Sequence, residues 1–172
     1  MATTETPMGV LHGYFLASDH TTAVDAAIGP YGGLLPPAGA DRPSTPGPAP
    51  DVALAVLVVY AEGAPSAVQP DGPELVWPAP RDLGREPGPA DGAWDTGLVL
   101  QRLPDRWRDV LAALPEDAVP LVAARWHESD EVDHPDYAVT LDTVEALSRL
   151  ARRARSAGGH LYCRSSTSAR AV

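Results

Sequence analysis

The residues with the richest chemistry lie in one segment, WHESDEVDHPDY, at positions 126–137. It holds five carboxylates and two histidines within twelve positions. Imidazoles and carboxylates can ligate a transition metal when the fold brings them together. Exposed carboxylates can instead steer a basic partner into contact, or keep a connector between two helices in water. The segment therefore allows a metal site, a partner-binding surface or a solvated loop.

Known metal signatures do not fit this segment. A zinc-protease helix needs His-Glu-x-x-His, but Glu131 stands where the second histidine belongs, and a calcium loop counted from Asp130 has Pro135 where glycine is required. His127 and His134 lie seven residues apart, and seven residues of helix rise about 10.5 Å. That separation is far for two ligands of one ion. Pro135 also disfavours helical backbone at His134. We therefore expect no metal or cofactor. The alternative is a metal-assisted hydrolase that uses His127, Glu131 and His134, with His12 or His20 added by the fold.

Taken alone, the segment most favours a solvated acidic loop between two helices, with a surface that docks a basic partner as the next alternative and a metal site after it. The segment is acidic and the chain holds no assembled catalytic set, so a non-catalytic protein-binding module, like immunity or inhibitor proteins, is favoured over an enzyme. Trp107 and Trp126 fit apolar helix faces and are expected in the core, whereas Trp77 and Trp94 adjoin proline-rich loops and either anchor them or bind a partner. The expected partner-binding residues are Glu128, Asp130, Glu131, Asp133, Asp136, Trp77 and Trp94.

Other catalytic classes find little support. The chain has no lysine, which excludes a Walker-type phosphate loop and a pyridoxal-phosphate Schiff base. The single cysteine, Cys163, permits no intrachain disulfide. His160 could serve it as a base, but residues three apart on a strand point to opposite faces, so we expect Cys163 to be packed in the core. No Gly-x-Ser-x-Gly elbow is present.

The charge distribution is uneven. The net charge is −10, yet residues 146–172 carry six arginines and no acid. Arg149, Arg152 and Arg153 either stabilise the end of a helix or pair with the acids of 128–136, within the fold or across a dimer. Nucleic-acid binding is not expected, because the acidic remainder would repel phosphates. The N-terminus lacks a secretory signal and no stretch is long enough to cross a membrane, so we expect a cytoplasmic protein.

The elements expected to position these residues are strands and amphipathic helices. Residues 9–17 read as a strand, with a helix capped by Ser18 or Asp19 after it. The valine-rich run 52–60 reads as the central, doubly buried strand. In the C-terminal half, helices are expected to begin near Pro104 and Pro120. A long helix starts with a capping box at Asp142 and Glu145 and ends at Gly158, and a short strand follows at 160–163.

Segments rich in proline and glycine separate the expected strands and helices. Thirteen of the nineteen prolines lie between positions 36 and 89, so 36–50 and 63–93 are expected to be long loops, the second interrupted by ELVW at 74–77. Residues 164–172 are expected to be a disordered polar tail. The sequence thus predicts one α+β domain over 1–163, with a small mixed sheet covered by helices.

Three segments carry a resemblance: GVLHGYFLASD, LPDRWRDVLAALPEDAVPLVAARW and LARRARSAGGHLYC. Together they resemble a group of small acidic actinobacterial proteins without an established activity. The resemblance covers about a third of the chain and has no chemical signature. It implies a bacterial cytoplasmic domain and assigns no catalytic residue. In that group the chain ends with an aromatic residue shortly after LYC, whereas Arg164 and a polar segment follow here.

Overall fold

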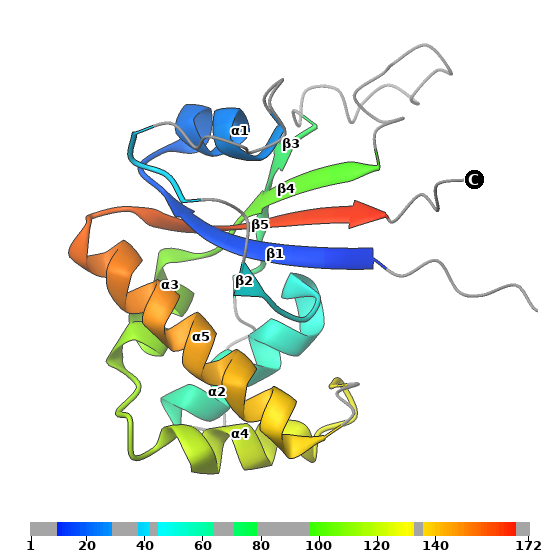
Figure 1. The fold of residues 1–172 in the computed structure, drawn as a ribbon. Coiled ribbons are helices and arrows are strands. Elements are labelled where there is room, and N and C mark those ends of the chain that lie inside the picture. Colours follow the sequence, from blue (N-terminus) through cyan, green and yellow to red (C-terminus); the bar gives the residue numbers. More distant parts are fainter. Residues whose placement is uncertain are drawn as a thin grey trace, which may run out of the picture.

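The computed structural model describes residues 10–28, 38–41, 45–63, 71–78, 97–132 and 136–167. Its five strands form one antiparallel sheet in the order β2-β1-β5-β4-β3 (Figure 1). The expected α+β class is confirmed, although every strand pair described is antiparallel, so the sheet is not mixed. The strands are β1 Val10–Ala17, β2 Thr45–Pro46, β3 Glu74–Trp77, β4 Leu98–Arg102 and β5 His160–Thr167, and the helices are α1 His20–Ile28, η1 Pro50–Leu54, α2 Ala55–Glu62, α3 Asp105–Ala113, α4 Val119–His127 and α5 Tyr137–Ser156.

Helices cover both faces of the sheet, and alternation along the strands divides the core in two. Helix α1 lies over one face, and α2 to α5 lie on the other (Figure 1). In β1, Tyr14 and Leu16 enter the larger cluster on the four-helix side, whereas Phe15 and Ala17 enter the smaller cluster under α1. Successive side chains of a strand point to opposite faces, which explains why one strand supplies both clusters.

The valine-rich run at 52–60 is helical, so its assignment as the central strand is wrong. A π-helical turn, η1, leads directly into α2. A continuous apolar run has no periodicity that separates a strand from a buried helix, and here Leu54, Leu57 and Val58 pack into the four-helix cluster. The centre of the sheet is instead β5, whose HLYC start was expected as a strand.

Helix α5 begins earlier than its expected capping box. Its N-cap is Asp136, whose carboxylate accepts a hydrogen bond of 3.0 Å from the Val139 amide. Asp142 therefore lies inside the helix and is not its N-cap. The other end agrees with expectation, because Gly158 follows the helix at φ +66°, a backbone conformation that favours glycine.

Two further boundaries differ from expectation. Strand β4, at 98–102, lies just before the helix expected near Pro104, in a stretch for which no strand was expected. Strand β5 continues through Arg164 to Thr167 and pairs with β1 and β4, so the first four residues of the expected disordered tail are strand. Residues 168–172 fall outside the ranges that the structure describes, as do 36–37 and 42–44 of the first proline-rich loop and 64–70 and 79–93 of the second.

Candidate functional site

The acidic connector is defined here as residues 128–136, which join α4 to α5. Glu128, Asp130 and Glu131 are exposed there. Asp136 has a structural role as the α5 N-cap. Asp133 and His134 lie in the undescribed gap between 132 and 136. All four described carboxylates of the connector are therefore on the surface, and one of them, Asp136, caps a helix.

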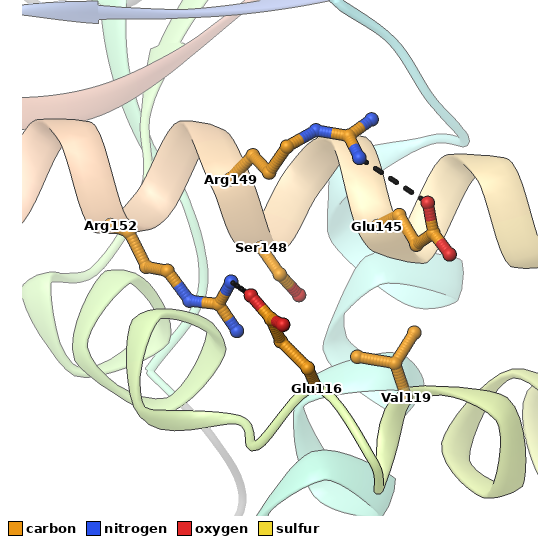
Figure 2. A pocket seen from close by; sticks show the side chains of 6 residues that line it. All are labelled: Glu116, Val119, Glu145, Ser148, Arg149 and Arg152. Carbon is orange, nitrogen blue, oxygen red and sulfur yellow. Dashed lines mark hydrogen bonds and ion pairs between the residues drawn. The ribbon is translucent and has the colours of Figure 1, made fainter.

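Three of the four arginines of α5 pair with acids other than those of the connector. Arg149 contacts Glu145 at 3.2 Å and Arg152 contacts Glu116 at 3.2 Å (Figure 2). Arg153 reaches an aspartate on the segment before β2, with Arg153 Nη2 2.7 Å from Asp41 Oδ2. Within the described part of the chain, none of Glu128, Asp130 and Glu131 forms an ion pair. These three carboxylates thus keep their negative charge, and the alternative of pairing with these arginines within the fold does not occur among the described residues.

Beside the connector lies an aromatic residue that the sequence analysis did not single out. Tyr137, the first residue of α5, remains 38% exposed. Its hydroxyl donates a 3.0 Å hydrogen bond to the Pro120 carbonyl, and its ring packs against that of His127 in a T-shaped arrangement, with the ring centroids 6.2 Å apart. Leu121, the residue after Pro120 on α4, is 57% exposed. An ordered tyrosine and an apolar side chain beside unpaired acids form a mixed surface of the kind found in protein interfaces.

The expected tryptophan site does not join this surface. Trp77 is partly buried and packs against the cluster under α1, on the opposite side of the sheet from α4 (Figure 1). Its position agrees with anchoring more than with binding beside the acids. Trp94 lies outside the described ranges. The two helical tryptophans, Trp107 and Trp126, are 1% and 0% exposed, so their expected place in the core is confirmed.

The described histidines are spread over separate parts of the molecule. His12 on β1 contacts Ser165 at 2.8 Å, and His127 on α4 contacts Thr140 at 2.9 Å. Burial lowers the pKa of His12, against a smaller opposing effect of Asp51. His20 is exposed at the start of α1. The described residues include no group of three or more His, Cys, Asp or Glu that could hold a metal ion, and His134 is not among them.

A polar network that the sequence did not indicate connects the ends of β4 and β5 to α3. Asp105 accepts a 2.7 Å hydrogen bond from His160 Nδ1–H and a 2.9 Å hydrogen bond from Arg102. Since Nδ1 donates to the carboxylate, it cannot also accept from Arg102 Nη2, which lies 3.0 Å away. Burial raises the pKa of Asp105, but His160, Arg102 and Arg108 outweigh it, so the pKa is lowered. The network ties the end of β4 and the start of β5 to the start of α3, and it orients the imidazole of His160.

Cys163 is fully buried, as expected. Its side chain faces the four-helix cluster, and its sulfur lies 3.9 Å from Ser165 Oγ. Burial raises the pKa of the thiol to about 12. His160 lies elsewhere, bound to Asp105. A thiol that stays protonated and has no base beside it is unsuited to nucleophilic catalysis.

Comparisons with known proteins assign no family. No protein-family model matches the chain, and no match was found among the curated proteins or among the solved structures. Across the described ranges, no helix combines the length and apolar character that crossing a membrane requires.

Proposed function

We propose that the protein is a non-catalytic binding module that docks a basic protein partner on the connector surface, defined as Glu128, Asp130, Glu131, Tyr137 and Leu121. One observation carries this proposal: Glu128, Asp130 and Glu131 are exposed and form no ion pair within the described residues, while Arg149, Arg152 and Arg153 pair with other acids. In a chain with a net charge of −10, such a surface speeds encounter with cations and orients them.

Tyr137 and Leu121 supply apolar contact area, which the acidic side chains lack. Exposed ion pairs contribute only about 0.2–1 kcal/mol each, so acids steer a partner without holding it tightly. A tyrosine already held by Pro120 and His127 loses little conformational freedom on binding and can bury its ring against the partner. The connector surface therefore combines a steering element with an anchor.

A charge-matched comparison tests the proposal. One variant carries Glu128→Gln, Asp130→Asn and Glu131→Gln, and the control carries Asp25→Asn, Asp71→Asn and Asp117→Asn, which are exposed positions on other segments. Binding of a fluorescent ten-residue arginine-rich peptide is measured by anisotropy at several salt concentrations. At about 0.5 kcal/mol per charge, the connector variant should bind about tenfold more weakly and with a flatter salt dependence.

The control variant has the same net charge, so any effect of total charge appears in both proteins. It should lose clearly less affinity than the connector variant. Equal losses would show that the peptide responds to net charge and not to the connector, which would refute the proposed docking site.

A further inference from the structure

A small pocket opens between α5 and the turn that joins α3 to α4 (Figure 2). Its volume is about 230 Å³, which suits a molecule smaller than a drug-sized ligand. It lies along the middle of α5, whereas the acidic connector precedes that helix. The lining residues are Glu116, Val119, Glu145, Ser148, Arg149 and Arg152.

Ser148 gives this pocket a buried polar group without a partner. Its side chain points from α5 into the pocket (Figure 2). Ser148 is 1% exposed, and its hydroxyl has no hydrogen-bond partner within the described structure. Helical serines and threonines commonly bond to the carbonyl four residues earlier. Thr143 does so, at 2.8 Å from the Val139 carbonyl, but Ser148 does not. A buried hydroxyl left unpaired costs free energy that a ligand could recover.

The charged groups around the pocket are balanced. Two ion pairs, Arg149–Glu145 and Arg152–Glu116, place two cations and two anions around it (Figure 2). Arg152 is also fixed by a 2.7 Å hydrogen bond to the Leu114 carbonyl, so its guanidinium is held before any ligand arrives. A ligand with one net charge would meet attraction and repulsion together, whereas a ligand that holds a positive and a negative group close together can pair with the acidic and the basic side chains at once.

We propose that this pocket binds a small zwitterion of the α-amino acid type. Its carboxylate accepts hydrogen bonds from Arg149, Arg152 and the Ser148 hydroxyl, and its ammonium group donates to Glu116 and Glu145. Val119 offers the only apolar side chain among the described lining residues, so a short side chain fits better than a large one. This site is independent of the proposed partner-binding function.

Titration with free amino acids, followed by ¹⁵N-resolved NMR of the intact protein, tests the proposal. The probes are L-alanine and L-serine, with N-acetyl-alanine amide as a neutral analogue and acetate or methylammonium as single charges. The two amino acids should cause saturable shifts confined to amides of residues 116–119 and 145–152. The neutral analogue and the single ions should cause none that saturate. Equal shifts from acetate or methylammonium would overturn the zwitterion assignment.

Removing a side-chain hydroxyl from α5 inside the pocket and another outside it separates loss of a ligand contact from the effect of deleting a hydroxyl anywhere on the helix. Ser148→Ala should weaken amino-acid binding about three- to tenfold, the range for loss of one hydrogen bond. Thr143→Val removes a hydroxyl that lies outside the pocket and should leave the affinity unchanged. The exposed double variant Glu145→Gln with Arg149→Gln should weaken binding further without disturbing the core. Wild-type affinity in Ser148→Ala, or in the double variant, would refute the site.

Discussion

Replacing each buried helical tryptophan with phenylalanine tests how the helical segment 50–62, which includes the run 52–60 expected as a strand, is held in place. Trp126 Nε1 donates a 2.8 Å hydrogen bond to the Ala53 carbonyl within η1. Trp107 is buried to the same degree, but its Nε1 has no hydrogen-bond partner in the described structure. The two substitutions thus make the same change in size at two sites that differ in hydrogen bonding.

The expected destabilisation follows from these contacts. The smaller ring leaves a partly filled space in each case, which costs about 1–2 kcal/mol. Trp126→Phe also loses a buried hydrogen bond, about 0.5–1.5 kcal/mol, and should cost about 2–3 kcal/mol in all. Trp107→Phe removes an unpaired buried N–H, which offsets about 1 kcal/mol or more, so its net cost should be about 0–1 kcal/mol.

Urea denaturation followed by circular dichroism at 222 nm measures the difference without depending on the lost fluorophores. The free energies of unfolding of the two variants should differ by about 2 kcal/mol, which for a chain of this length corresponds to about 4–8 °C in Tm. The comparison holds when the two m-values agree. Equal losses in both variants would show that the Trp126–Ala53 hydrogen bond does not stabilise the η1–α2 segment.

Two further predictions concern groups with altered pKa values. Asp105→Asn should lower stability at pH 7 by about 0.5–1 kcal/mol, a modest value because the carboxylate is 42% exposed. Since the folded pKa of Asp105 lies below the ordinary 3.8, the difference from wild type should be full above that ordinary value and shrink as pH falls through the folded value. A difference that did not shrink on acidification below pH 3.8 would contradict this. Cys163, with its pKa raised to about 12, should react with iodoacetamide at pH 8 far more slowly in the native protein than in urea, as measured by mass spectrometry; equally rapid labelling of the native protein would show that the thiol is accessible.

Local signals in the sequence were sufficient for several elements. The apolar stripe of α5 repeats at helical spacing, and that face is buried, including Val144, Leu147 and Ala151. Asp19 precedes α1 and accepts a 2.9 Å hydrogen bond from the Thr22 amide, as a capping residue should. These predictions were correct because each depends on residues within one or two turns of one another.

The candidate sites depended on contacts that no local pattern encodes. The sequence placed the acids of the connector together, but whether arginines neutralise them was decided by packing, which set Arg152 against Glu116 and Arg153 against Asp41. The same holds for Tyr137, whose partner Pro120 is 17 residues away.

The division between the two kinds of information has one physical reason. The sequence by itself determined composition, net charge, the burial of Cys163 and the amphipathic helices, because these follow from residue type and short-range spacing. Only the tertiary structure decided that 50–62 is helical, that β4 joins the sheet, and that Ser148 lines a pocket with charged walls. Those outcomes depend on which distant surfaces meet, and the free energy of their burial outweighs local preference.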